Sequence, residues 1–428
     1  MKTARFTDMA RGRPGLVGAF FIDAVGTGMF LPFSLLFFLA TTSLPLTRIG
    51  LGLSIAAVAR IPATIAAGAL SDRFGPRSAI VVSQLLQAAG FVGYLFVDSF
   101  WRLIAAAVLV QVGNSIFWVA YAPLIFAIAA EGEREDWFAL STALRTAGLA
   151  AGGVIAGATV AAGGRDGFLG VAVANAASFV LAAFLSGKTG PGTGGPGRGT
   201  EPEAVPDGGW KPLLRDRPFL GFVAVNVGIT FLALAVPLAL PVFVVTTMDL
   251  PTWAPGLALA LNAILVAVSA PAVMSVIAGR RRSRVLTISQ GLMLVVFAVL
   301  LLAHLLPSGA AIALVLVAIA PLAACEVMQA AVVPAVVTES AAPGTVGRYT
   351  SAYQVTFSIG DIIVPVIVTA ALRAGADTLW LPLSAVAVAD LVAVSALARR
   401  MAVLTRPVGQ AEPALASQAE RLSEADGL

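Results

Sequence analysis

The sequence predicts an all-α membrane protein with twelve transmembrane helices, arranged as two six-helix halves. Of its 428 residues, 58% are hydrophobic and 12% are charged, and the mean hydropathy is +0.92. A soluble domain carries about twice that share of charged residues. Apolar stretches along the chain approach the roughly 20 residues that a helix needs to cross a bilayer. Helices are expected because backbone groups without hydrogen bonds are intolerable in lipid.

The twelve apolar stretches fall at about 15–40, 49–70, 79–97, 103–130, 139–162, 167–186, 218–248, 254–278, 285–306, 309–338, 349–372 and 378–398. Between the sixth and seventh, residues 187–209 are rich in glycine and proline without apolar periodicity, which predicts a flexible linker. The chain therefore divides into an N-terminal half (1–186), a cytoplasmic linker (187–217), a C-terminal half (218–400) and a disordered cytoplasmic tail (401–428).

The basic residues are distributed unevenly between the loops. If the N-terminus is cytoplasmic, 21 of the 27 lysines and arginines lie on that side, four lie in the opposite loops and two lie inside spans. Cytoplasmic loops of membrane proteins carry such an excess. We therefore expect a multi-pass protein of the cell membrane with both termini in the cytoplasm. No cleavable signal peptide is visible, because the first apolar stretch has the full length of a span.

Several function classes are excluded by composition. The chain has one histidine and one cysteine, His304 and Cys325, so no intramolecular disulfide or multi-histidine metal site is expected. The net charge of +4 reflects the loop bias and does not indicate nucleic acid. Residues 192–197 spell a glycine pattern of nucleotide-binding proteins, but they lie in the linker with no strand before them. We expect no nucleotide, no cofactor and no enzymatic activity.

The segment between the second and third stretches combines five informative residues: Gly68, Asp72, Arg73, Gly75 and Arg77. The charges cannot stay in hydrocarbon, so the turn belongs at a membrane surface. The pattern is similar to the loop between the second and third spans of the major facilitator superfamily, a similarity that extends over nearly the whole chain. The resemblance implies that these residues form a latch between the two halves. The alternative is an ordinary turn that only fixes topology.

A glycine-rich stretch marks the fifth span. Gly148, Gly152 and Gly157 leave a smooth helix surface that another helix can approach closely. They match a motif of the exporter branch of the same superfamily, although two other positions of that motif differ. Gly360 and Pro365 repeat part of the pattern in the eleventh span. Ordinary close packing is the alternative interpretation.

Asp23 is the leading candidate for proton coupling. It lies about nine residues past the cytoplasmic end of the first span, about 13 Å deep at ~1.5 Å per residue. A carboxylate at that depth is costly and is normally functional. It resembles the acidic first span of drug:proton antiporters, and the alternative is a permanent structural ion pair. Arg60 and Arg145, the two arginines inside spans, are its candidate partners, and the sequence does not choose between them.

Other polar residues within spans complete the candidate site. Glu326 and Asp361 are second candidates for proton coupling, and Arg60 and Arg145 are candidates for substrate binding. The resemblance implies that spans 1, 2, 4, 5, 7, 8, 10 and 11 line a central cavity. The remaining substrate-site candidates on those spans are Gln111, Asn114, Trp118, Tyr121, Asn226, Asn262, Gln329, Tyr353 and Gln354. Each of these could instead form a helix–helix hydrogen bond.

These features predict a secondary transporter that exports a small amphipathic compound, driven by the proton gradient, and that works as a monomer. One departure from the drug:proton antiporters is that the fourth span lacks an arginine at depth. Two alternatives remain open. The chain could take up an anionic solute held by Arg60 and Arg145, or it could be a receptor or scaffold that transports nothing.

Overall fold

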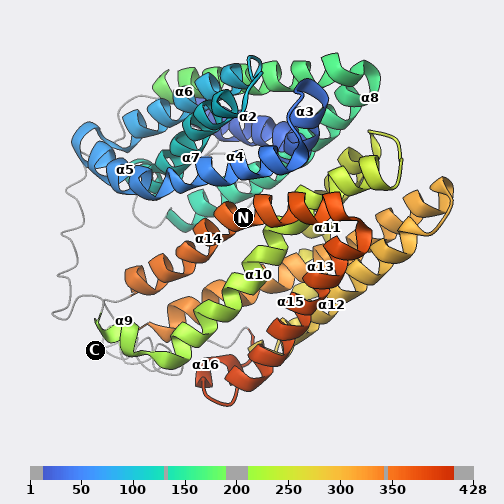
Figure 1. Cartoon of the computed structure of the whole chain (residues 1–428). Helices are drawn as coiled ribbons and strands as arrows, with labels where there is room; N and C mark the ends of the chain where they lie inside the picture. The colour runs from blue at the N-terminus through green and yellow to red at the C-terminus, as the bar shows by residue number, and fades with distance from the viewer. Residues whose placement is uncertain (1–12, 130–133, 189–210, 342–345, 409–428) are drawn as a thin grey trace.

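The computed structural model describes residues 13–129, 134–188, 211–341 and 346–408. In Figure 1 the helices of the N-terminal half, blue to green, form one layer above those of the C-terminal half, yellow-green to red. The first half contains α2 (Pro14–Phe30), the 3-10 turn η1 (Leu31–Phe33), α3 (Ser34–Thr41), α4 (Leu46–Val58), α5 (Arg60–Phe74), α6 (Pro76–Tyr94), α7 (Phe100–Ile128) and α8 (Arg134–Lys188).

The second half begins with the short helix α9 (Lys211–Arg215), which lies in the segment predicted to be linker. It continues with α10 (Arg217–Val242), the π-helical turn η2 (Phe243–Thr247), α11 (Ala254–Ile277), α12 (Arg282–His304), α13 (Ser308–Ser340), α14 (Val346–Ala374), α15 (Ala376–Leu397) and α16 (Ala402–Thr405). Most of the predicted linker and residues 409–428 of the predicted tail lie outside the described residues.

Nine of the described helices are long and apolar enough to cross a membrane, and the pair α2–α3, bent by 56°, makes up to ten. The other two expected spans are accounted for by α8 and α6. Helix α8 covers two stretches because the chain turns at Gly164, whose φ of 51° is readily adopted only by glycine. Helix α6, with 19 residues, coincides with the third stretch but is not among the nine apolar helices, and it contains the polar residues Gln84 and Gln87. The helices thus follow the twelve predicted stretches.

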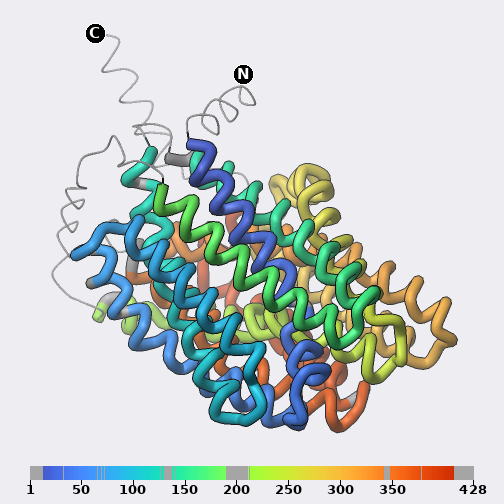
Figure 2. The backbone as a smooth tube through the Cα atoms, turned by 90° about the horizontal axis from the view of Figure 1, so that it is seen from above, coloured from blue at the N-terminus to red at the C-terminus, as the bar shows by residue number. Residues whose placement is uncertain are grey.

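The two arms of α8 lie side by side around α2. The chain reverses at Gly164. Just after this turn, the backbone of Thr159 lies so close to Gly167 that a Cβ there would not fit. Gly148 and Gly152 of the first arm pack directly on the backbone of α2. The second arm packs on α2 on the other side, where Asn175 and Ser178 approach Gly26. Figure 2 shows α2 running between these two arms.

The same pairings recur in both halves. In the first, α2 packs on α8, and α6 packs on α7 and α8; in the second, α10 packs on α14 and α15, and α12 packs on α13 and α15. The corresponding helices therefore occupy corresponding places, as expected for repeated halves that surround a site between them.

The halves meet through small residues. Gly157 of α8 faces Gly256 of α11, and Gly50 of α4 packs against Pro365 and Thr369 of α14. A side chain at any of these glycines would meet backbone or a short side chain of the other half. The helices can therefore approach closely here, as small residues allow in membrane proteins.

One predicted boundary differs from the structure. Residues 401–408 were expected to belong to the disordered tail, but they form α16 and then pair with the segment 279–282 through backbone hydrogen bonds. Local composition could not reveal this, because the partner segment lies more than a hundred residues earlier in the chain.

Candidate functional site

Asp23 lies on α2, where the arms of α8 and helix α6 cover it. Its side chain is only 4% exposed, and its Oδ1 atom has no hydrogen-bond partner among the residues that the structure describes. Glycines produce this burial, because Gly148 and Gly152 bring the backbone of α8 against α2 within one turn of the carboxylate. A buried carboxylate with an unused oxygen is a group that can accept a proton or a ligand donor.

Arg145 is the arginine that accompanies Asp23. It lies on the first arm of α8 and interacts electrostatically with Asp23 and with Tyr121 of α7. Its guanidinium carbon lies 4.7 Å from the centroid of the Trp118 ring, a cation–π contact. Tyr121 shares a 2.5 Å hydrogen bond with Ser141. We call Asp23, Arg145, Trp118 and Tyr121 the span-1 cluster.

Trp118 gives the span-1 cluster an accessible aromatic surface. Its side chain is 43% exposed, although it lies well inside α7 and contacts both Arg145 and Tyr121. A half-exposed indole beside a guanidinium and a phenol can contact the apolar part of a ligand while the polar groups orient it.

Gln84 is a member of the site that the sequence analysis missed. It lies on α6, is fully buried, and its side-chain amide interacts with the Asp23 carboxylate. Both polar atoms of its amide lack a hydrogen-bond partner in the described part of the chain. A signal was present in the sequence, since the pair Ser83-Gln84 in the third span recurs as Ser289-Gln290 in the ninth.

Arg60 has a different partner from the one considered first. It begins α5, just after the break between α4 and α5, and forms an ion pair with Asp361 of α14 in the other half. The two side chains are 20% and 25% exposed. One substrate-site candidate thus neutralises one proton-coupling candidate, and the pair joins the two halves.

Glu326 is held by an amide. Asn262 of α11 donates from Nδ2 to both carboxylate oxygens of Glu326 on α13, at 3.1 and 3.2 Å. One turn later, Gln329 donates to the sulfur of Cys325 at 3.2 Å. These residues form a second polar group, which belongs entirely to the C-terminal half.

The other candidates are less closely connected. Asn226 is buried and donates to Thr356 at 2.8 Å, so it joins α10 to α14 as a helix–helix hydrogen bond. Tyr353 packs edge-on against Phe357. The structure places three candidates outside both polar groups, two half-buried on α7 and one exposed on α14: Gln111, Asn114 and Gln354.

Asp390 is buried on α15 against Gly228 of α10. It lies outside the span-1 cluster and outside the Glu326 group. Among the described residues, no group of three or more His, Cys, Asp or Glu could hold a metal ion.

The predicted latch lies at the end of α5. Gly75 has a φ of 82°, which ends α5 and allows α6 to start at Pro76. Arg77 donates to the backbone oxygens of Ser186, at 2.9 Å, and of Gly187 at the end of α8. This contact satisfies carbonyls that the end of a helix leaves free, and it lies within one half. The side chain of Asp72 is outside the described part.

Comparison with known proteins gives three findings. Residues 16–365 match the protein family described as the Major Facilitator Superfamily. Multidrug resistance proteins MdtH of Yersinia pestis (strain Pestoides F) and Yersinia pseudotuberculosis (serotype O:1b) are each 30% identical to the chain over 196 residues, 46% of this chain and 47% of the relative. The chain thus spans about half the length of the curated relatives it matches.

Solved structures share the fold. The nucleoside transporter NupG superposes with a TM-score of 0.73 at 12% identity, over 90% of this chain and 99% of that one. An auto-inhibited peptide transporter of the POT family superposes with a TM-score of 0.71 at 15% identity, over 94% and 99%.

Proposed function

The chain belongs to the major facilitator superfamily and is a secondary transporter of a small molecule, and we propose that it exports an amphipathic compound in exchange for protons. The observation that carries this proposal is the buried Asp23, with one unpaired oxygen, beside Arg145. A carboxylate within a membrane span is costly and is usually functional, and proton relays are a common use.

The proposed cycle uses the charge of Asp23. When Asp23 is ionised, it balances Arg145, and the guanidinium stays over Trp118. Protonation of Asp23 removes that balance and also removes the negative charge that the cationic group of an amphipathic substrate would bind. Substrate and proton then compete for the same cluster, which is what exchange transport requires.

The aromatic surface supports an amphipathic substrate. Trp118 offers exposed ring area beside the half-buried ring of Tyr121, while Arg145 and Asp23 offer charges of both signs within the same group. The distant MdtH relatives are named for multidrug resistance, and export of such compounds agrees with this surface.

We further propose that the protein lies in the cell membrane with both termini in the cytoplasm. In that orientation, Gly157, Gly256, Gly50 and Pro365 belong to the outer ends of their helices. The contacts between halves at these residues would then close the outer side. Loading of substrate from the cytoplasm would start from this arrangement.

The arginine geometry favours export over the anionic-solute alternative. Uptake of an anion between Arg60 and Arg145 would need both guanidinium groups. Arg60 is already paired with Asp361, and Arg145 is balanced by Asp23. Binding an anion would have to displace both carboxylates.

The test is efflux of a fluorescent lipophilic cation from proteoliposomes under an imposed pH gradient. Native protein is expected to show gradient-dependent efflux, and Asp23→Asn is expected to reduce it to background because the amide cannot take up a proton. Asp390→Asn is the matched control, since Asp390 is also a buried carboxylate but lies outside the cluster. Equal loss in both variants, or no movement of cation by the native protein, contradicts the proposal.

A further inference from the structure

A basic hollow lies at the end of the C-terminal half, away from the proposed transport site. Its volume is about 670 Å³, and it lies between the start of α12 and the end of α15. Three arginines line it, Arg280, Arg281 and Arg284, together with hydroxyl-bearing residues of both helices. Arginine guanidinium groups and hydroxyls are the usual donors for a phosphate group.

The segment that carries these arginines is fixed in place. The backbone of Gly279 donates to Val408 at 3.0 Å, Val408 donates to Arg280 at 2.9 Å, and Arg282 donates to Arg406 at 3.0 Å. The chain after α15 therefore returns and ties down the turn before α12. The hollow is thus lined by an ordered segment on one side and by α15 on the other.

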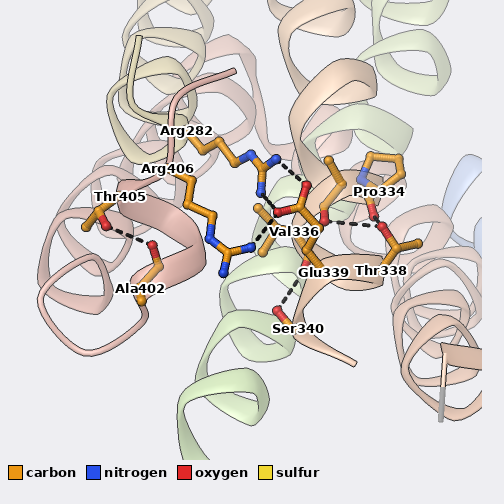
Figure 3. Close-up of polar contacts among 10 residues, drawn as sticks. Arg282, Pro334, Val336, Thr338, Glu339, Ser340, Ala402, Thr405 and Arg406 are labelled. Atoms are coloured by element: carbon orange, nitrogen blue, oxygen red, sulfur yellow. Dashed lines mark hydrogen bonds and ion pairs between the residues drawn. The ribbon is translucent and has the colours of Figure 1, made fainter. Parts of the chain in front are cut away.

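One carboxylate near the hollow is already occupied. Glu339, at the end of α13, accepts hydrogen bonds from Arg282 and, at 3.0 Å, from Arg406. Figure 3 shows both guanidinium groups pointing at this carboxylate. Within the described residues, no ion pair with a carboxylate is formed by the three arginines that line the hollow. Their charge is therefore available to a ligand.

An apolar surface continues from the hollow along both helices. On α12, Thr287 lines the hollow, and Gly291, Val295 and Leu302 follow at spacings of four, four and seven residues, so they share one face. Val295 and Leu302 are 49% and 51% exposed, and a Cβ on Gly291 would meet nothing within 4 Å. The face above the hollow on α12 is therefore open and apolar.

Helix α15 presents the matching face. Ser395 lines the hollow, and Val392 and Val388, three and seven residues earlier, are 59% and 47% exposed. Since α12 and α15 pack together, both apolar faces start from the same hollow. In a multi-pass membrane protein, an open apolar surface of this kind faces lipid tails.

We propose that this surface binds an anionic phospholipid, with its phosphate in the hollow among Arg280, Arg281 and Arg284 and its acyl chains along α12 and α15. The charge selects a phosphate, and the apolar faces that adjoin it select a molecule with tails over a soluble phosphate. Basic pockets between helices at the cytoplasmic side of membrane proteins have this chemistry. The inference does not depend on which substrate is transported.

The test measures lipid binding to the purified full-length chain by native mass spectrometry, with phosphatidylglycerol and phosphatidylcholine as the two probes. The native chain is expected to prefer phosphatidylglycerol. The triple variant R280Q/R281Q/R284Q is expected to bind it about 100-fold more weakly, since each arginine near an anionic lipid contributes about 1 kcal/mol. Phosphatidylcholine binding should not change.

The matched control replaces three exposed basic residues elsewhere near the same end of the half: Lys211→Gln, Arg215→Gln and Arg217→Gln. This triple variant removes the same charge and should retain preferential binding of phosphatidylglycerol. A second variant, Gly291→Trp, keeps every charge and obstructs the acyl-chain path on an open surface. It should also weaken phosphatidylglycerol binding, and it stays informative if the arginine triple variant fails to fold.

Three outcomes would overturn the proposal. If both triple variants weaken binding equally, general surface charge is responsible. If soluble glycerol phosphate displaces the lipid completely, the site recognises a phosphate and not a lipid. If phosphatidylglycerol binds the native chain without preference over phosphatidylcholine and gains that preference only after deletion of residues 409–428, which contain Glu412, Glu420 and Glu424, the tail occupies the hollow.

Discussion

The two halves of the molecule share a framework and differ in how they hold their acidic groups. Ser83-Gln84 on α6 and Ser289-Gln290 on α12 are equivalent pairs, and both serine hydroxyls bond to the carbonyl three residues earlier, at 2.6 and 2.8 Å. Both glutamines are fully buried. In the first half the side-chain amide of Gln84 interacts with the Asp23 carboxylate. Glu326, an acid of the second half, is held instead by an amide from another helix.

The difference separates charge balance from hydrogen bonding. In the N-terminal half an arginine compensates the carboxylate, so proton binding changes the net charge of a coupled pair. In the C-terminal half Glu326 accepts hydrogen bonds from the neutral Asn262 amide. Protonation of Asp23 leaves the charge of Arg145 uncompensated, because a guanidinium cannot lose its proton, whereas protonation of Glu326 leaves no charge behind on Asn262. The first arrangement therefore responds more strongly to a proton.

The contacts at helix glycines also differ between the two halves. A Cβ at Gly152 would meet the backbone of α2 at Val25 and Met29. A Cβ at Gly360 of α14 would overlap the end of the Leu234 side chain and touch the Thr230 methyl group at ordinary contact distance. Backbone cannot yield without moving a helix, but a leucine end can rotate. The N-terminal half is thus the more rigid support for its carboxylate.

The largest effect is expected from Arg145→Gln. It leaves Asp23 buried without its compensating charge, which costs about 3 kcal/mol of folding stability. The loss should be larger at alkaline than at acidic pH, since protonation of Asp23 removes the uncompensated charge. Thermal unfolding in detergent at several pH values measures it. Asp23→Asn added to this variant should restore stability, and failure of that rescue would show that the two residues are not coupled.

Gly152→Ala tests the packing difference. The added methyl group would overlap the backbone of α2, so a loss of about 1–3 kcal/mol is expected, the usual cost of overpacking. Gly360→Ala is the matched change in the other half, where the leucine end can move, and it should cost clearly less. Similar unfolding temperatures for both variants would contradict the proposed difference in rigidity.

The pair between the halves should contribute less. A double-mutant cycle with Arg60→Gln and Asp361→Asn is expected to give a coupling energy of about 1 kcal/mol, because both side chains are partly exposed. The pair Arg102–Asp98, whose side chains are 63% and 65% exposed, is the control and should show almost none. Equal coupling in the two cycles would mean that Arg60 and Asp361 only meet as a surface pair.

Glu326→Gln should have the smallest effect. The Asn262 amide can still donate to the new side-chain carbonyl, so a loss of less than about 1 kcal/mol is expected. Its unfolding curve should also depend less on pH than that of Arg145→Gln. A loss as large as that of Arg145→Gln would remove the distinction between the two halves.

Much of the fold could be predicted because membrane helices are local. The apolar stretches ended where charges, glycine and proline occur, and the described helices follow them, including the turn at Gly164. The position of Asp23 within the first helix also followed from counting residues. The tail was predicted less well, because residues 401–408 are ordered by partners in the segment 279–282.

The candidate site was predicted only in part. Position along a span identifies a buried polar residue but not the direction in which it points around the helix relative to its neighbours. Asn226 looked like a cavity residue and instead bonds Thr356 of an adjacent helix. Gln84 had no charge to draw attention to it, and only its repeated counterpart gave a signal.

By itself, the sequence determined a multi-span helical protein of two related halves with charged residues inside its apolar stretches, because hydropathy and charge act along the chain. The tertiary structure alone decided that Arg145 accompanies Asp23 and that Arg60 pairs with Asp361, 301 residues away. Such pairings depend on how each helix is rotated and tilted. Those angles are set by close packing at residues such as Gly148 and Gly50, where the neighbour is distant in sequence.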